Sequence, residues 1–215
     1  MPMRAGAAMM ARVDPNTFFE NELWQSGLKY IAGLDEAGRG ALAGPVSVGA
    51  VILPHDQSLL ASTLSGARDS KQMTPRQRER LAIQIKEIAL NWSVGFADAY
   101  EIDLQGIVRA TRLAAIRALH KFSLSPEYLL TDFRLELPQL EISQTSLVKG
   151  DACCLSIACA SILAKTERDA LMQKLDSRHP GYQLGKHKGY GTQAHRSAMK
   201  RLGMSEIHRR SFHVK

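Results

Sequence analysis

The 215-residue chain is 45% hydrophobic and 23% charged, which excludes a disordered or fibrous protein, and its length fits one domain with at most a small appendage. No apolar run reaches the roughly 18 residues that a membrane helix needs, and no apolar centre marks a signal peptide, so we expect a soluble, cytoplasmic protein without a membrane partner. Lys and Arg number 28 against 21 Asp and Glu, and the net charge of +7 favours a polyanion as partner.

The N-terminal half of the sequence alternates helix and strand patterns. Residues 1–13 show no pattern, and we predict a disordered tail there. Apolar residues at helical spacing predict a short helix over residues 14–27. Residues 30–34 and 46–53 are typical of two buried, paired strands. The sequence TPRQ at residues 74–77 is a capping box with proline at the first helical position, and it predicts a helix start.

The second half continues the alternation. We predict a strand over residues 92–97 and a helix over residues 101–121. Two strands follow at 128–131 and 142–148. The long helix predicted for residues 155–175 begins with Ala, Ser and Cys, which are small enough to let it lie close to a sheet. This order predicts an α/β architecture around a mixed sheet.

Positive charge is concentrated in residues 186–215, where eight residues are Lys or Arg and only Glu206 is acidic. We predict a helix from Thr192 followed by irregular chain. Two interpretations of the charge are open: a solvated basic tail, or a segment that contacts a polyanion.

Three of the predicted strands end in acidic residues: Asp35 and Glu36 follow the first, Asp132 the fourth and Asp151 the fifth. Strand ends meet at the sites of α/β proteins, and carboxylates at contact distance need a cation such as Mg²⁺ to offset their repulsion. The alternative is four ordinary strand-end or helix-capping acids. Because neighbouring residues of a regular strand point to opposite faces, we expect a bend or bulge at Asp35 and Glu36.

A glycine-rich turn follows the first pair of acids. Its spacing is GxGxxxG, and it leads into a strand instead of a helix, which argues against the dinucleotide-binding fingerprint. Gly38 and Gly40 allow the backbone to approach a ligand closely, for example the 2′-hydroxyl that distinguishes RNA from DNA.

The cysteines and histidines indicate no competing site. Three cysteines within seven residues, Cys153, Cys154 and Cys159, form no disulfide framework or zinc spacing, and we expect reduced packing residues. The histidines considered as ligands or bases are His187, His195, His208 and His213. They follow no metal-binding pattern, and hard Mg²⁺ disfavours imidazole, so a structural role is the simpler interpretation.

Several motifs together resemble the type 2 ribonuclease H family, and within it bacterial ribonuclease HII. The matching segments are GLDEAGRG at 33–40, LAGPV at 42–46, RDSKQMT at 68–74, EID at 101–103, AT at 110–111, KGD at 149–151, LSIACASILAK at 155–165, HKGYGT at 187–192 and HRRSF at 208–212. The likeness extends from about residue 30 to the end. It implies a ribonuclease H-like fold with a central mixed sheet flanked by helices and a small C-terminal helical extension.

The resemblance also implies an activity. Family members hydrolyse the RNA strand of RNA/DNA hybrids and cut on the 5′ side of single ribonucleotides in duplex DNA, leaving 5′-phosphomonoesters, in the removal of misincorporated ribonucleotides and RNA primers. The implied division is a catalytic domain over residues 14–185 and a basic, substrate-binding segment over residues 186–215. We expect two Mn²⁺ or Mg²⁺ ions, no organic cofactor, and a monomer acting on hybrids and on ribonucleotide-containing duplex DNA.

Site residues follow from the same motifs. The family's metal-binding and catalytic carboxylates match Asp35, Glu36, Asp132 and Asp151. Its substrate-binding positions match Gly38, Arg39, Gly40 and Tyr190, and we expect Lys186 and Lys188 near phosphates. Lys71 and Lys165 are further candidates for phosphate contacts, with surface lysines as the equal alternative. With two ions supplying activation of water and stabilisation of the leaving oxygen, no side-chain nucleophile is needed. We expect Asp35 and Asp132 to lie nearest both ions.

Some positions depart from the family pattern. Ala41 replaces the usual proline, Phe133 a common glycine and Gly106 a frequent asparagine, while Cys153 and Cys154 replace more polar residues. None of these changes removes a metal ligand. Two further hypotheses are a nucleic-acid-binding module without catalysis and a nucleotide-cofactor enzyme.

Overall fold

The computed structural model describes residues 14–133 and 135–212, and the tail predicted over residues 1–13 lies outside them. A five-stranded mixed sheet in the order β3-β2-β1-β4-β5 forms the centre of the molecule. Its strands are β1 (Ile31–Ala37), β2 (Val46–Ile52), β3 (Asn91–Ala97), β4 (Tyr128–Asp132) and β5 (Ser143–Leu147). Strand β1 pairs antiparallel with β2 and parallel with β4, which confirms the predicted mixed sheet.

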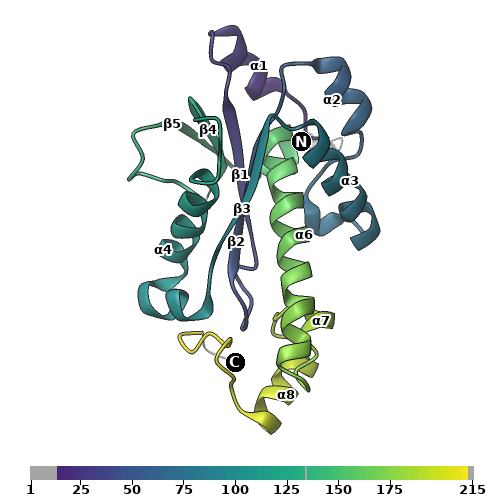
Figure 1. Cartoon of the computed structure of the whole chain (residues 1–215), viewed down its shortest axis with the longest axis vertical. Coiled ribbons are helices and arrows are strands. Elements are labelled where there is room, and N and C mark those ends of the chain that lie inside the picture. Colours follow the sequence, from purple (N-terminus) through teal and green to yellow (C-terminus); the bar gives the residue numbers. More distant parts are fainter. Residues whose placement is uncertain (1–13, 134, 213–215) are drawn as a thin grey trace, which may run out of the picture.

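Helices cover both faces of this sheet, with α4 on one side and α6 on the other (Figure 1). The helices are α1 (Phe18–Gln25), α2 (Gln57–Thr63), α3 (Pro75–Ile88), α4 (Ala99–Leu119), α5 (Gly150–Cys153), α6 (Leu155–Arg178), α7 (Leu184–His187) and α8 (Gln193–Leu202), with a 3₁₀ turn at Ser70–Gln72. A buried hydrophobic cluster lies on each face of the sheet. This arrangement confirms the predicted α/β fold class.

Helix α6 lies against the sheet as its small residues predict. A Cβ atom on Gly33 of β1 would come within 2.3 Å of the Ser156 backbone, and one on Gly49 of β2 within 2.2 Å of the Ala160 carbonyl oxygen. The two glycines and the small residues of α6 are therefore complementary, and they bring the helix backbone close to β2 and to β1, which carries Asp35 and Glu36. Cys153, Cys154 and Cys159 are free thiols, as expected.

Several element boundaries differ from the prediction. Helix α1 begins at Phe18 because Asn16 forms an isolated bridge with Cys154, which holds the preceding chain extended. Helix α2, capped by Asp56, was not predicted because seven residues are too few to establish a helical period. Helix α4 contains a kink at Gly106, whose φ of +81° lies in the region that favours glycine.

The first strand is longer than expected and contains Asp35 and Glu36 instead of ending before them. Its pairing with β2 continues one to one, from Ala32–Ile52 to Ala37–Ser47, without an extra residue. The predicted bend or bulge is therefore wrong. Pairing between β1 and β4 stops at Leu34–Thr131, whereas β4 continues to Asp132, which pairs with Leu147 of β5. Asp35 and Asp132 therefore directly follow the last paired residues of β1 and β4.

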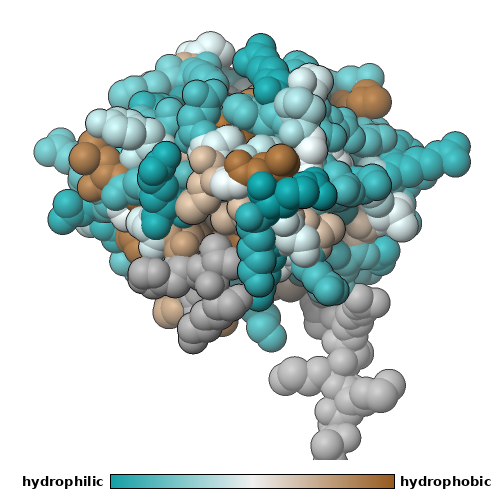
Figure 2. Space-filling model, turned by 90° about the horizontal axis from the view of Figure 1, so that it is seen from below, coloured by the Kyte–Doolittle hydropathy of each residue, from teal (hydrophilic) through white to brown (hydrophobic). Residues whose placement is uncertain are grey.

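The C-terminal part of the chain packs against the end of the molecule where β1 turns into β2 (Figure 1). A third hydrophobic cluster joins residues of the turn, α6 and the last helices: Leu42, Ala43, Met172, Tyr182, Leu184, Ala198 and Met199. The predicted boundary after residue 185 falls inside α7. Seen from this end, the surface is mostly hydrophilic, with separate hydrophobic residues (Figure 2). Among the described residues, no helix has the length and apolar character needed to cross a membrane.

Candidate metal centre and nucleic-acid interface

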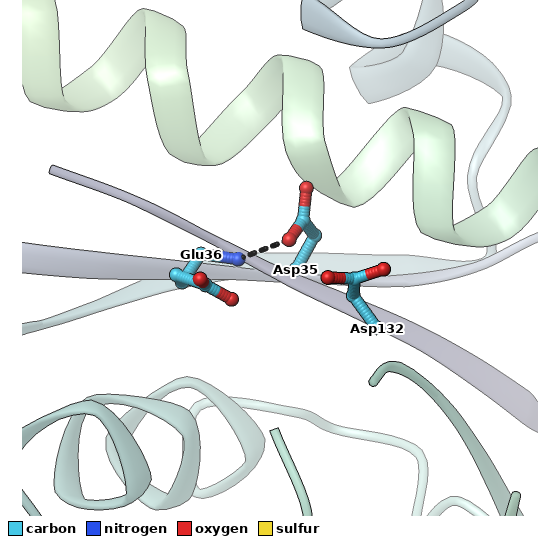
Figure 3. Close-up of side chains that lie close together, drawn as sticks. All are labelled: Asp35, Glu36 and Asp132. Carbon is cyan, nitrogen blue, oxygen red and sulfur yellow. Dashed lines mark hydrogen bonds between the residues drawn. The ribbon is translucent and has the colours of Figure 1, made fainter. Parts of the chain in front are cut away.

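Three acidic side chains converge where the pairing between β1 and β4 ends. Asp35 and Glu36 of β1 and Asp132 at the end of β4 each offer a carboxylate oxygen, and these oxygens all lie within 4.8 Å of one another (Figure 3). The Glu36 N–H donates to Asp35 Oδ1 at 2.7 Å, and Asp132 Oδ1 accepts the Gly150 N–H at 2.8 Å. The side chains meet without a bulge in β1, at the point where pairing between β1 and β4 stops.

The electrostatics of this cluster suit a bound cation. Asp35 is 3% exposed, and burial, followed by the charge of Glu36, raises its pKa well above the ordinary value. Asp35 Oδ2 and Glu36 Oε2 are both buried without a hydrogen-bond partner among the described residues. Buried carboxylate oxygens without donors match the all-oxygen ligand set of Mg²⁺ and Mn²⁺. The donor set therefore fits a hard divalent ion.

Asp151 lies beside this group but is not one of its three members. It follows Gly150, whose N–H donates to Asp132, and the charge of Asp132 contributes to the raised pKa of Asp151. Burial, followed by the charge of Asp69, raises the pKa of Asp151 to about 6. Asp69 was not predicted, although it lies in the RDSKQMT segment. The structure thus brings together three of the four expected ligands, with the fourth alongside them.

A cavity of about 440 Å³ adjoins the carboxylates. Its lining residues are Glu36, Ala37, Gly38, Arg39, Gly40, Ser70, Lys71, Arg78, Lys165 and Tyr190. Arg39 also forms an ion pair with Glu36 at 3.6 Å. Although burial lowers the pKa of Lys71, the charges of Asp35 and neighbouring acids raise it, and the net shift is upward. The wall of the cavity therefore combines glycine backbone with cations that can face a phosphate.

The four predicted lysines divide between two cavities. Lys71 and Lys165 line the cavity described above, and Lys165 Nζ also binds Asp169 Oδ1 at 2.7 Å. Lys186 and Lys188 instead line a neighbouring cavity of about 390 Å³, and Lys188 Nζ donates to the Gly185 carbonyl oxygen. Arg78, which the sequence did not single out, lines both cavities. Its guanidinium donates to the Ser70 and Met73 carbonyls.

Tyr190 enters the first cavity from the loop between α7 and α8. Lys165 Nζ lies 5.4 Å and Arg168 Cζ 5.5 Å from the centre of its ring. A Cβ atom on Gly189, whose φ is +81°, would meet the Ala43 carbonyl oxygen at 2.2 Å, so only glycine permits this approach of the two loops. The aromatic ring and the glycine turn therefore face one cavity.

The histidines behind this loop form a hydrogen-bonded chain, as their structural interpretation suggests. Ser205 N–H donates to His208 Nδ1 at 3.0 Å, the Nε2 atoms of His208 and His195 lie 3.2 Å apart, and His195 Nδ1 binds the Tyr190 carbonyl oxygen at 3.0 Å. One set of tautomers satisfies all three contacts with both imidazoles neutral. His187 stacks on His195 at 4.3 Å. The chain links the C-terminal segment to the Tyr190 loop.

Mild acid is expected to destabilise this arrangement through His208. Burial, followed by the charge of His195, lowers the pKa of His208 to about 4. The unfolded chain therefore binds a proton near pH 6.5 that the folded protein does not bind until about pH 4, and stability falls as pH drops between these values. Urea unfolding at pH 7.5 and pH 5 should show a loss of about 1–3 kcal/mol from this group. In His208→Asn, the loss of unfolding free energy between pH 7.5 and pH 5 should be smaller by the contribution of His208. An unchanged loss would contradict the assignment of this pH dependence to His208.

Comparisons with known proteins agree with this geometry. A family model described as Ribonuclease HII matches residues 32–215. A Ribonuclease HII from Dehalococcoides mccartyi is 48% identical over 204 residues, which cover 95% of each chain. Among solved structures, the ribonuclease H2 from Pyrococcus horikoshii OT3 has a TM-score of 0.67 at 26% identity, over 85% of this chain and 93% of that one. Bst-RNase HIII in complex with Mn²⁺ shares the fold, with a TM-score of 0.62 at 18% identity over 86% and 67% of the chains.

Proposed function

The chain belongs to the ribonuclease HII family, whose model matches residues 32–215, and from this premise we propose that it cuts duplex DNA on the 5′ side of a single embedded ribonucleotide. Membership makes the protein a metal-dependent endoribonuclease that acts on the RNA strand of RNA/DNA hybrids. The finer proposal concerns substrate choice, the number of ions and the role of each residue. Such an enzyme would remove misincorporated ribonucleotides and RNA primers.

Three of the four carboxylates form the cluster, and the fourth lies beside it. Asp35, Glu36 and Asp132 would hold the divalent ions, Mn²⁺ or Mg²⁺, and Asp151 would complete the set from the start of α5. When bound, a pair of such ions supplies an activated water and stabilises the departing 3′-oxygen. The buried position of Asp35 keeps bulk water from its carboxylate and so strengthens its interaction with a cation.

The residues around the cavity would orient the nucleic acid. Lys71 and Lys165 face the cavity and can pair with phosphates that flank the scissile bond. The backbone of Gly38 and Gly40 can approach a ribose 2′-hydroxyl, because neither residue has a Cβ atom between backbone and ligand. The Tyr190 ring would stack on the sugar of the adjacent deoxynucleotide. The three clustered carboxylates beside this glycine-lined cavity are the observation that carries the proposal.

A duplex with one ribonucleotide tests the proposal directly. With Mn²⁺ or Mg²⁺ present, we expect a single cut on the 5′ side of the ribonucleotide, and a 5′-phosphate on the downstream product. The matched control is an all-DNA duplex of the same sequence, which should stay intact because it lacks the 2′-hydroxyl. Equal cutting of both duplexes, or cutting only of continuous RNA strands in hybrids, would contradict the proposed substrate choice.

A further inference from the structure

Two arginines lie fully buried beneath the glycine turn. Arg168 of α6 and Arg209 of the C-terminal segment each have 0% exposed surface. Across residues 14–133 and 135–212, neither guanidinium forms an ion pair with a carboxylate. Burial, followed by the charge of Arg168, lowers the pKa of Arg209 to about 9. Buried charges without counter-ions are costly, so their hydrogen bonds must compensate.

All side-chain hydrogen bonds of these two arginines go to backbone carbonyl oxygens. Arg168 donates to the carbonyls of Pro45, Lys188 and Ala43, at 2.8, 2.9 and 3.2 Å. Arg209 donates to those of Gly44, Arg39 and Gly38, at 2.9, 2.9 and 2.8 Å. Five of the six carbonyls thus belong to the turn over residues 38–45, and the sixth belongs to the loop that carries Tyr190.

These contacts fix the direction of two peptide groups. In a planar trans peptide group the N–H and the carbonyl point in opposite directions. The Gly38 carbonyl shares its peptide group with the Arg39 N–H, and the Arg39 carbonyl shares its peptide group with the Gly40 N–H. Because Arg209 binds both carbonyls, both N–H groups point away from Arg209. Neither N–H has a hydrogen-bond partner among the described residues. Gly38, Arg39 and Gly40 line the cavity, whereas Arg168 and Arg209 do not, so the turn separates the guanidiniums from the cavity. The two free N–H groups therefore face the cavity side.

We propose that Arg168 and Arg209 are positioning residues, which hold the backbone of the glycine turn with the N–H groups of Arg39 and Gly40 presented to the ribose and its phosphate. This inference rests on the proposed function, since it names the residues that hold the backbone of the same substrate site in place. The contact with Arg168 is close: a Cβ atom on Gly38 would meet Arg168 Nε at 1.9 Å. Two unpaired cations directly behind the turn also add positive potential where a phosphate would bind.

Arg→Lys substitutions test this role, because lysine keeps the positive charge but cannot bind three carbonyls with the planar fork of a guanidinium. For Arg209→Lys we expect kcat/KM on the one-ribonucleotide duplex to fall about tenfold. The inhibition constant of an all-DNA duplex of the same sequence should change less than about twofold, since phosphate contacts away from the turn remain. Arg117→Lys is the matched control: its guanidinium binds the Phe96 carbonyl and Glu101 but no carbonyl of the turn over residues 38–45, and neither constant should change.

A direct readout accompanies the kinetics. In ¹⁵N NMR spectra of the free protein, the amide signals of Arg39 and Gly40 should shift or broaden in Arg209→Lys and stay unchanged in Arg117→Lys. If Arg209→Lys does not fold, Phe212→Leu replaces it, since that variant keeps both guanidiniums but removes the ring 5.1 Å from Arg209 Cζ. For Phe212→Leu we expect a smaller loss of kcat/KM on the one-ribonucleotide duplex, about threefold. As for Arg209→Lys, the inhibition constant of the all-DNA duplex should change less than kcat/KM does.

The outcomes separate the two proposals. Two results for Arg209→Lys would overturn the positioning role and leave a merely structural one. The first is a lower unfolding temperature with unchanged kcat/KM, and the second is an equal loss in kcat/KM on the one-ribonucleotide duplex and in the affinity for the all-DNA duplex. If the wild-type protein itself does not distinguish the two duplexes, the proposed function fails and the inference fails with it. If the wild type distinguishes the one-ribonucleotide duplex from the all-DNA duplex and Arg209→Lys distinguishes them equally well, only the positioning role is overturned.

Discussion

Replacement of Asp35 by Asn is expected to lower kcat on an RNA/DNA hybrid roughly a thousandfold or more, while the affinity for the hybrid stays within about threefold. Asp35 is the most buried of the three clustered carboxylates, and one of its oxygens is buried without a donor. An amide of the same shape cannot supply the negative charge that a divalent ion requires. Lys71 and Lys165 line the adjoining cavity, and the phosphate contacts proposed for them do not involve Asp35, so binding should survive.

The same substitution is expected to stabilise the ion-free protein. Burial and the charges of Glu36 and Asp132 oppose ionisation of Asp35, and the neutral amide removes this repulsion. Thermal unfolding in the presence of a chelator should therefore show a higher unfolding temperature for Asp35→Asn than for the wild type at pH 7.5.

The matched control is Glu87→Gln, which neutralises an exposed carboxylate on α3 far from the cluster. It should leave kcat, affinity and unfolding temperature unchanged. Full activity of Asp35→Asn would show that the cluster is not the metal centre. Loss of hybrid affinity in parallel with kcat would instead indicate a general distortion of the site.

The sequence predicts the sheet and its helices well because their signals are local. The capping box at Thr74 marks the start of α3, and the small residues after Leu155 match the close approach of α6 to Gly33 and Gly49. The four acids were found from strand-end positions and from motifs. Three of them converge, which supports the expectation of a shared site but does not assign their roles.

What the sequence could not predict depends on contacts between distant segments. The strand over Asp35 and Glu36 continues because β2 pairs with it throughout, and the acids meet without a bulge where pairing between β1 and β4 stops. No local pattern distinguishes Arg168 from the exposed cations of a helix, or Arg209 from a solvated basic tail. Their burial results from packing between α6, the C-terminal segment and the glycine turn. For Arg209, the interpretation as part of a solvated tail is wrong.

Saturating Mn²⁺ is expected to raise the unfolding temperature by roughly 5–10 °C at pH 7.5, and by less than half of that at pH 5.5. Burial, followed by the charge of Asp69, raises the pKa of Asp151 to about 6, and burial, followed by the charge of Glu36, raises the pKa of Asp35 well above its ordinary value. The folded protein thus holds protons that the unfolded chain has lost above about pH 4. The stability that the proton on Asp151 provides is fully present below that pH and is lost as pH rises through about 6, which weakens the ion-free protein at pH 7.5.

Ion binding follows the opposite trend, since at pH 5.5 an ion must displace the proton that Asp151 still holds, and at pH 7.5 that carboxyl group has already lost it. Calorimetric scans with Mn²⁺ and with a chelator at both pH values measure the difference. Asp132→Asn should lose most of the Mn²⁺ effect at pH 7.5, because it removes one of the three converging carboxylates, whereas Glu87→Gln should retain it. A Mn²⁺ effect that is equal at the two pH values, or that survives Asp132→Asn, would mean that the ion binds somewhere other than between β1 and β4.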